Sequence, residues 1–187
     1  MLENVAGFLD SDAHRMAAEN LQSLGYKIHV LERSPTHFGV PMRRPRVYLV
    51  ATANGVIFEA GNENTTKMVS LEDFVNDSFT EDLIVSKQDF DKYGRSLHIV
   101  RPGQDEAYAT CFTSGYWKSF KSSGTFIELE NEKIRRFSPE EIVALMGFSA
   151  TFSFPKHLSL QAKLQLAGNT VDVRAIEYML NGLSSFD

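Results

Sequence analysis

Hydrophobic residues recur every three to four positions over residues 10–24, which predicts an amphipathic helix. The repeating positions are Ala13, Met16, Ala17, Leu21 and Leu24. Asp10, Ser11 or Asp12 can cap the start of this helix. Alternation over residues 26–31 predicts a strand, and the apolar run over 47–51 predicts a strand covered on both faces. This order of elements is typical of the edge of an α/β sheet.

The pattern changes between residues 55 and 136. Short β-like segments alternate there with polar loops that contain glycine, and no helical period is sustained. The segments cover residues 56–59, 83–86, 98–100 and 125–129. We therefore predict a small inserted or appended domain of irregular structure.

Clear helical patterns return after residue 137. Ser138 and Glu141 form a capping box, and Pro139 occupies the first helical position, where its missing N–H costs nothing. A second helix is predicted over 159–166 and a third over 171–183. The third is predicted to bury one face, made of Val173, Ile176, Tyr178 or Met179, and Leu180.

Composition limits the class of protein. The 187 residues are 43% hydrophobic, enough for one substantial core or two small ones. No apolar run approaches the roughly 18 residues of a membrane span, and no basic segment followed by an apolar run suggests secretion. Cys111 is the one cysteine, which excludes an internal disulfide and a Cys-rich zinc site. We predict no metal site and a reducing compartment, cytosol or nucleus.

Charge is unevenly distributed along the chain. The net charge of −5 argues against indiscriminate nucleic-acid binding but allows a local basic face. Acidic residues concentrate over residues 72–91. Basic residues gather elsewhere, at Arg43, Arg44 and Arg46, at Lys118 and Lys121, and at Lys133, Arg135 and Arg136. The alternative is that both groups are solvated faces of opposite sign.

Two blocks near the start of the chain carry ionisable side chains. Glu3-Asn4-Val5 forms the first, and Arg44-Pro45-Arg46 precedes the strand predicted at residue 47. Arginine suits a binding role because its planar fork offers fixed donors to carbonyl and phosphate oxygens.

A third block, Thr110-Cys111-Phe112-Thr113-Ser114-Gly115-Tyr116, leads into an aromatic and basic segment. This segment predicts a platform on which an unstacked base could lie, formed by Tyr116, Trp117 and Phe120. Lys118 and Lys121 would make phosphate contacts beside it. The alternative is that these aromatic residues form the core of the small domain.

Two further blocks follow. The first is Arg136-Phe137-Ser138-Pro139-Glu140-Glu141-Ile142 with Met146-Gly147-Phe148, and the second is Gly168-Asn169-Thr170-Val171. Glycine lets the backbone approach a ligand, and Asn169 or Thr170 can cap the following helix.

These blocks, in this order, resemble the back half of a cytosine-5 methyltransferase. The block at residues 110–116 resembles the Cys-Phe-Thr signature of the type-2 DNA methyltransferase homologues, which are known for methylating a cytosine in the anticodon loop of tRNA. Ser114 replaces the usual Lys, which removes a phosphate-binding charge. The resemblance covers most of residues 2–54 and 107–183 and implies a partial doubly wound, Rossmann-like α/β sheet with a target-recognition domain.

The resemblance also implies roles. In this chemistry a thiolate adds to carbon 6 of cytosine while an acid neutralises ring nitrogen 3, and S-adenosylmethionine gives the methyl group. Glu3 would be the acid, with Arg44 and Arg46 holding the base and backbone. The methyl donor would contact Gly168, Asn169, Thr170 and Val171. Nucleic acid would contact Arg43, Cys111, Phe112, Thr113, Tyr116, Lys118 and Lys121.

The chain contains neither the Pro-Cys nucleophile nor the Gly-rich donor loop that the resemblance implies. We therefore expect a second polypeptide or missing sequence to supply them, and a parallel sheet with an exposed apolar face. The expected domains are 1–54 and 137–187 for the catalytic part and 55–136 for target recognition. Two alternatives stay open: a non-catalytic nucleic-acid-binding or regulatory module, and a fragment of a DNA methyltransferase.

Overall fold

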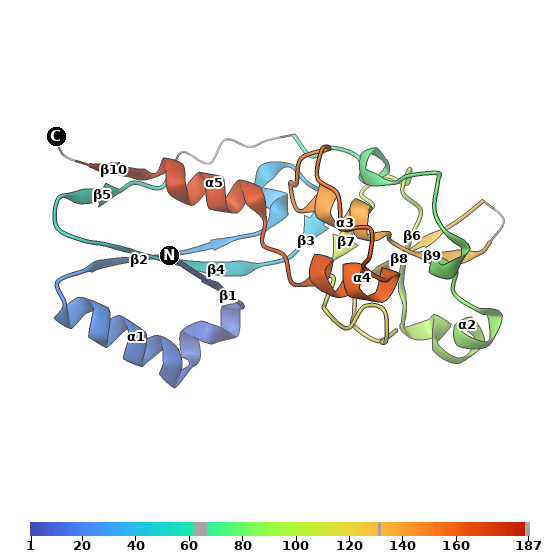
Figure 1. Cartoon of the computed structure of the whole chain (residues 1–187), viewed down its shortest axis with the longest axis horizontal. Helices are drawn as coiled ribbons and strands as arrows, with labels where there is room; N and C mark the ends of the chain where they lie inside the picture. Colours follow the sequence, from blue (N-terminus) through green and yellow to red (C-terminus); the bar gives the residue numbers. More distant parts are fainter. Residues whose placement is uncertain (62–66, 131, 186–187) are drawn as a thin grey trace.

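The computed structural model describes residues 1–61, 67–130 and 132–185 and has two halves along its long axis (Figure 1). One half is built on a sheet of order β1-β4-β2, with α1 and α5 on opposite sides. The other is built on a sheet of order β6-β8-β9 with α2, α3 and α4 nearby. The α/β class is confirmed.

The helices are α1 (Asp12–Ser23), α2 (Lys87–Tyr93), α3 (Pro139–Leu145), α4 (Leu160–Gly168) and α5 (Val173–Asn181). Short 3-10 turns are η1 (Ala6–Asp10), η2 (Pro35–Phe38), η3 (Leu71–Phe74), η4 (Glu81–Leu83) and η5 (Gly94–Ser96). The strands are β1 (Leu2–Asn4), β2 (Lys27–Arg33), β3 (Met42–Arg43), β4 (Arg46–Thr52), β5 (Val56–Phe58), β6 (His98–Val100), β7 (Ala109–Thr110), β8 (Thr125–Glu128), β9 (Ile134–Arg136) and β10 (Leu183–Ser185).

The first half differs from the expected parallel sheet. β4 pairs with β1 and with β2 in antiparallel register. The chain reverses through η2 between β2 and β4, which accounts for the second pairing. The α5 side of this sheet carries a small core of Tyr48, Val50, Phe58, Ala175 and Met179. Leu180 was predicted to be buried, but 54% of it is exposed, because it lies on the outer face of α5.

The second half holds the larger core, which surrounds Phe112, Tyr116, Phe126 and Phe137. Side chains of α3 and α4 belong to this core, whereas the buried residues of α5 pack on β4. Residues 83–86, predicted to form a strand, form the end of η4 and one isolated bridge. The region also contains the short helix α2, which the sequence pattern did not predict. The domain boundaries at residues 54 and 136 stay predictions.

A buried ion pair joins the second sheet to α3. Arg135 and Glu141 are almost completely enclosed, and two guanidinium nitrogens donate to the two carboxylate oxygens at 2.8 and 2.9 Å. The carboxylate also accepts from the backbone N–H groups of Ser138, at 2.6 Å, and Asn76, at 2.7 Å. The Ser138–Glu141 capping box is thereby confirmed, and its glutamate has a second role in the core.

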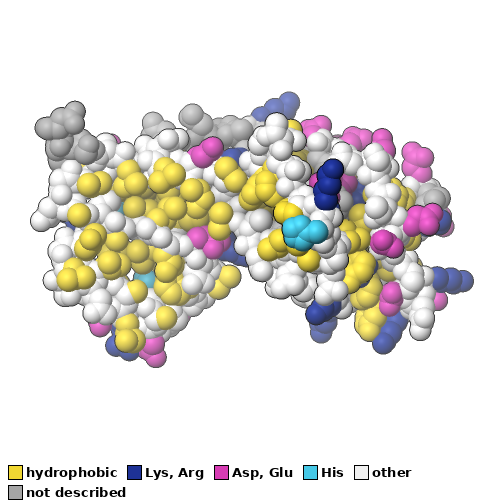
Figure 2. All heavy atoms as spheres, in the orientation of Figure 1, with side chains coloured by type: hydrophobic (Ala, Val, Ile, Leu, Met, Phe, Trp, Pro, Cys, Tyr) yellow, Lys and Arg dark blue, Asp and Glu magenta, His cyan; other side chains and the backbone are white. Residues whose placement is uncertain are grey.

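Hydrophobic side chains are exposed around β1 and α1. Met16 and Leu24 belong to the apolar positions of the predicted amphipathic helix, but 58% and 73% of their surfaces are exposed, and α1 has no buried residue. Exposed apolar residues also flank the free edge of β1, at Met1, Leu2, Val5 and Leu9. Figure 2 shows hydrophobic side chains gathered over the half that carries α1, β1 and α5. No helix in the described ranges is long and apolar enough to cross a membrane.

Replacing Glu141 by alanine leaves Arg135 charged and enclosed without its partner. We expect Glu141→Ala to lower the free energy of unfolding by about 3–5 kcal/mol, measured from urea unfolding curves. Glu140→Ala is the matched control, because Glu140 is exposed and lies 3.9 Å from Lys163. It should change stability by about 0.5 kcal/mol or less. Equal effects of the two variants would contradict this role for the ion pair.

The exposed apolar surface beside β1 predicts self-association of the purified chain. Val5→Asp combined with Leu9→Asp should shift the chain towards monomer in sedimentation experiments over a wide range of protein concentration. Met68→Asp with Val69→Asp is the control, since these side chains are similarly exposed but lie in the other half. A monomeric wild-type chain with one cooperative unfolding transition would refute the prediction.

Candidate functional site

Glu3 and Arg46 meet because of strand register. Glu3 on β1 lies opposite Tyr48 on β4, so both side chains point to the same face of the sheet. Arg46 is two residues before Tyr48 and therefore shares that face. Its Nε lies 3.2 Å from Oε1 of Glu3, an ion pair with both side chains mostly covered. Oε1 of Glu3 has no hydrogen-bond partner among the described residues, so this contact is electrostatic.

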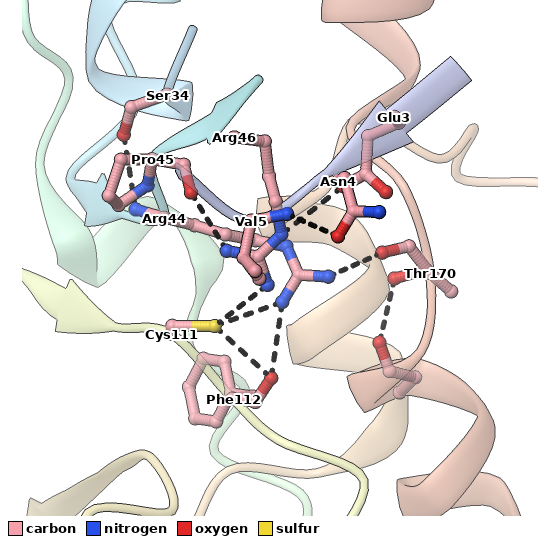
Figure 3. A network of polar contacts seen from close by, with 11 residues as sticks. Glu3, Asn4, Val5, Ser34, Arg44, Pro45, Arg46, Cys111, Phe112 and Thr170 are labelled. Carbon is pink, nitrogen blue, oxygen red and sulfur yellow. Dashed lines mark hydrogen bonds and ion pairs between the residues drawn. The ribbon is translucent and has the colours of Figure 1, made fainter. Parts of the chain in front are cut away.

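Arg44 connects three segments that are distant in sequence (Figure 3). Its Nη2 donates to the carbonyl oxygen of Thr170 at 2.7 Å, and its Nη1 donates to that of Phe112 at 3.3 Å. Nη1 also lies 3.0 Å from Sγ of Cys111. The backbone N–H of Arg44 donates to Oγ of Ser34 at 3.1 Å. The side chain is 6% exposed, so its donors position protein backbone before any ligand binds.

A cavity of about 360 Å³ opens between these segments, and Figure 2 shows the surface hollowed between the two halves. Its lining combines a carboxylate, two guanidinium groups, a thiol and backbone polar groups. The lining residues are Glu3, Asn4, Val5, Arg44, Arg46, Cys111, Phe112, Thr113, Ser114, Gly168 and Asn169. Four sequence blocks therefore contribute to one concave polar site.

Gly168 has a structural reason to be glycine. A Cβ at this position would collide with the backbone carbonyl group of Thr113 and approach the backbone N of Ser114 to 2.8 Å. The sequence suggested a close approach to a ligand, but the observed approach is to this loop. Gly168 thus lets the end of α4 close one wall of the cavity.

The neighbours of Gly168 behave differently from the expected cap. Asp172, rather than Asn169 or Thr170, caps α5 by accepting from the backbone N–H of Arg174 at 3.2 Å. The hydroxyl of Thr170 donates to Ala167 at 2.7 Å instead. Asn169 is exposed at the cavity wall, and 36% of Val171 is exposed outside the lining.

The protonation of two groups near Glu3 is shifted by burial. Burial raises the pKa of Tyr48, and the nearby carboxylates of Glu3 and Asp172 raise it further. Burial also raises the pKa of Asp172, against the opposing effect of Arg174. Tyr48 is therefore a neutral phenol at pH 7.

Tyr116 does not form part of a base-stacking platform, which corrects the sequence interpretation. Its side chain is completely buried, because its hydroxyl donates to the carbonyl oxygen of Thr125 and accepts from the backbone N–H of Phe137 at 2.9 Å. Phe112 is buried beside it, with ring centroids 5.0 Å apart, and only its backbone faces the cavity network. These two aromatic residues form core, as the alternative interpretation proposed.

The remaining predicted contacts lie outside the cavity lining. Lys118 and Lys121 are exposed on the segment that follows Tyr116. Arg43 is also exposed, and its guanidinium carbon lies 3.6 Å from the ring centroid of Tyr108. Sequence reasoning did not identify Ser34, whose hydroxyl positions the backbone of Arg44. Ser34 lies in the loop between two predicted strands, and no sequence pattern linked it to the site.

Comparisons with known proteins agree on one family. The family model for C-5 cytosine-specific DNA methylase matches residues 1–185. The tRNA (cytosine(38)-C(5))-methyltransferase of Schizosaccharomyces pombe is 24% identical, over 97% of this chain and 62% of that protein. Type II methyltransferase M.MspI of Moraxella is 29% identical, over 98% of this chain and 45% of that protein.

Solved structures show the shared fold. The crystal structure of the S. pombe Dnmt2 methyltransferase aligns with a TM-score of 0.84 at 23% identity, covering 95% of this chain and 62% of that one. A Spodoptera frugiperda DNMT2 mutant aligns with a TM-score of 0.85 at 20% identity, covering 96% and 64%. This chain thus spans less than two thirds of the length of these relatives.

Lysine at position 44 keeps the charge but cannot reach all three segments at once. We expect Arg44→Lys to lower the free energy of unfolding by about 1–3 kcal/mol, because backbone acceptors lose their donors. Hydrogen exchange of residues 111–114 should become faster. Arg15→Lys is the control, because Arg15 forms an exposed pair with Asp12. Unchanged exchange in residues 111–114 would show that Arg44 does not hold this loop.

Proposed function

The chain belongs to the C-5 cytosine-specific DNA methylase family, and we propose that it forms the target-base side of a cytosine-5 methyltransferase that acts on tRNA. One observation carries this proposal: Glu3, Arg44 with Arg46, and Gly168 with Asn169 come from three sequence blocks and line one cavity. A base in a stack cannot reach such groups, so the target cytosine must be unpaired or flipped out.

Glu3 is proposed as the acid at ring nitrogen 3 of the cytosine. As a thiolate adds to carbon 6, the Glu3 carboxyl gives its proton to nitrogen 3, and it recovers this proton when the thiolate is eliminated. Arg46 lies against Glu3 and can transfer its donors to the base carbonyl or an adjacent phosphate. Arg44 has a positioning role, since its N–H groups already bind Phe112 and Thr170.

The chain offers one wall of a methyl-donor site. Methyltransferases of this family generally use S-adenosylmethionine, which supplies an electrophilic methyl group. The exposed Asn169 offers an amide donor and acceptor at the cavity wall, where Gly168 contributes no side chain. These features fit the edge of a donor pocket, and we propose that Gly168, Asn169, Thr170 and Val171 border it.

A second segment is needed to complete the chemistry. Cys111 follows threonine rather than proline, and its Sγ lies within 3.4 Å of a nitrogen of each of Arg44 and Arg46. We therefore propose that Cys111 lines the base pocket and that the nucleophile comes from elsewhere. The exposed apolar residues beside β1 suit a partner polypeptide. This partner would be equivalent to the part of the relatives that this chain does not span.

The β1 edge suits this partner better than the β2 edge. Lys27, Glu32 and Arg33 place charges along β2, and such charges protect natural sheet edges from pairing. The β1 side exposes Leu2 and Val5, and the charged side chain of β1, Glu3, is mostly covered. The exposed Val30 of β2, by contrast, lies between the charged residues of that strand.

The substrate proposal depends on the recognition segment. The Cys111-Phe112-Thr113 signature favours tRNA over DNA, and tRNA methyltransferases are among the relatives. DNA is the second candidate, because the type II relative has the higher identity, 29% against 24%. A non-catalytic binding module is the third, because the chain has no Pro-Cys pair.

Transfer of labelled methyl groups from S-adenosylmethionine tests the proposal. We expect transfer to tRNA only when a polypeptide carrying the Pro-Cys and Gly-rich segments is added. Glu3→Gln should lower this rate by roughly 100-fold or more, because glutamine cannot donate the proton. Glu81→Gln is the matched control, since Glu81 is exposed in the other half.

The possible outcomes separate the three candidates. Preferential methylation of duplex DNA would replace tRNA by DNA as the substrate. RNA binding without transfer, with and without the added polypeptide, would indicate the non-catalytic module. A rate in Glu3→Gln equal to that of Glu81→Gln would remove Glu3 from the acid role.

A further inference from the structure

A second cavity of about 350 Å³ adjoins the target-base cavity. Its lining residues are Ser96, His98, Thr110, Cys111, Ser122 and Gly124. Cys111 lines both cavities, so the segment from Thr110 to Ser114 passes along one and then the other. Consecutive residues of an extended chain advance by about 3.3 Å, which places the two cavities a few residues apart along one strand-like segment.

The lining of this second cavity suits the edge of a nucleobase. It contains three hydroxyl groups, one imidazole and one thiol, and it includes no lysine, arginine or carboxylate. A phosphate would require charged donors, whereas a base edge presents neutral donors and acceptors. Positive side chains lie nearby in sequence or space instead, at Lys121, next to Ser122, and at Arg43 over Tyr108.

His98 is held in place by its strand partner. β6 and β8 are parallel neighbours, and His98 lies opposite Thr125 in their register. Nδ1 of His98 is 2.9 Å from Oγ1 of Thr125, which in turn accepts from the backbone N–H of Thr110 at 2.7 Å. The ring also packs on Tyr108, with centroids 5.1 Å apart. Because Nδ1 is hydrogen-bonded to Thr125 and the ring is held in place, Nε2 is the nitrogen that can form a hydrogen bond with a ligand.

The protonation of His98 agrees with such a contact. Burial lowers the pKa of His98 below its usual 6.5, and the nearby Arg43 lowers it further. The imidazole is therefore neutral at pH 7, and its two nitrogens have opposite hydrogen-bonding roles. A single neutral contact can distinguish bases by their donors and acceptors.

The opposite wall of the cavity is conformationally restricted. Ser122 has a φ of 52°, a left-handed conformation that is uncommon for residues other than glycine. Gly124 has a φ of 154°, and a Cβ there would lie 2.6 Å from the ring of Phe112. The loop therefore runs against the aromatic core, and its position is fixed beside His98 and Cys111. Such restricted backbone is frequent at binding sites.

We propose that the second cavity receives the nucleotide adjacent to the target cytosine in a single-stranded segment, and that His98 reads the base of that nucleotide. This inference rests on the proposed function, because it uses the first cavity as the position of the target base. Arg43 and Lys121 then lie where they can contact the phosphates that flank the two nucleotides. The chain thus selects a two-nucleotide sequence rather than a lone cytosine.

Binding of RNA hairpins to the full chain tests the inference. Each hairpin carries one cytosine in its loop, and the nucleotide on either side is varied among four bases and an abasic site. Fluorescence anisotropy gives the affinity. We expect the affinity of the wild-type chain to vary roughly fivefold with the base at one neighbouring position, because one hydrogen bond contributes about this factor to binding. In His98→Ala this variation should fall to within about twofold, while the abasic RNA binds both proteins alike.

Two further variants keep the result interpretable. His157→Ala is the matched control, since His157 is exposed and outside both cavities, and it should retain the wild-type preference. Ser96→Leu fills the mouth of the second cavity from an exposed position, so it should remove the preference without disturbing the core. Ser96→Leu also tests the subsite by itself if His98→Ala does not fold.

The outcomes distinguish the subsite from the function on which it rests. Loss of the neighbour preference in His98→Ala and Ser96→Leu, but not in His157→Ala, supports the subsite. A preference that persists in both cavity variants overturns the subsite and leaves the proposed function intact. Wild-type binding that does not depend on the loop cytosine overturns the proposed function together with the subsite.

Discussion

The site depends on one buried cation. Among residues 1–61, 67–130 and 132–185, no carboxylate lies within hydrogen-bonding distance of Arg44, yet its guanidinium is enclosed, so the cost of removing it from water must be met by neutral acceptors. The carbonyl oxygens of Phe112 and Thr170 meet part of that cost, and both belong to segments that form the cavity. The cation therefore fixes the distance between the two halves where the target base would enter. Ser34 completes the arrangement by holding the Arg44 backbone.

The loop that Arg44 binds is itself supported from behind. Tyr116 ties this loop to β8 and to the start of α3 through its hydroxyl, and Glu141 ties α3 to Arg135 on β9. Removing these polar groups from water is costly, but the Tyr116 hydroxyl, the Glu141 carboxylate and the two terminal nitrogens of Arg135 are all hydrogen-bonded, so the second half has few alternative arrangements. The backbone of residues 111–114 thus faces the cavity in one conformation. Pre-positioned backbone of this kind costs no reordering when a substrate binds.

Sequence patterns predicted α1, α3, α4 and α5 and the two longest strands, β2 and β4. They also predicted residues that line the cavity, because helix caps, apolar periods and motif order are local or collinear features. α3 and its capping box illustrate this. The patterns failed where a distant contact decides the outcome. Tyr116 stands next to lysines and other polar residues in the sequence, which suggested an exposed ring. In the fold, Thr125 and Phe137 enclose it. Asp172 caps α5 because the helix begins at Val173, with two residues between it and the Gly168-Asn169-Thr170 block. The exposure of Met16 and Leu24 likewise depends on which other segments cover α1. The periodicity of the helix sequence carries no information about those segments.

The pairing of Glu3 with Arg46 constrains how the acid can work. A guanidinium beside a carboxylate stabilises the ionised form, whereas the proposed role needs a proton on Glu3 when cytosine is present. The contact at 3.2 Å is an ion pair without a hydrogen bond, and both groups face a cavity large enough for a base. A cytosine entering between them separates the pair: its carbonyl can take the arginine donors, and its ring nitrogen faces the carboxyl. Substrate binding would then exchange one partner of Glu3, the Arg46 guanidinium, for another, the ring nitrogen of cytosine. Cys111, whose Sγ contacts a nitrogen of each arginine, already binds Arg46 through Nη2, a different nitrogen from the Nε that meets Glu3, and can keep this contact during the exchange.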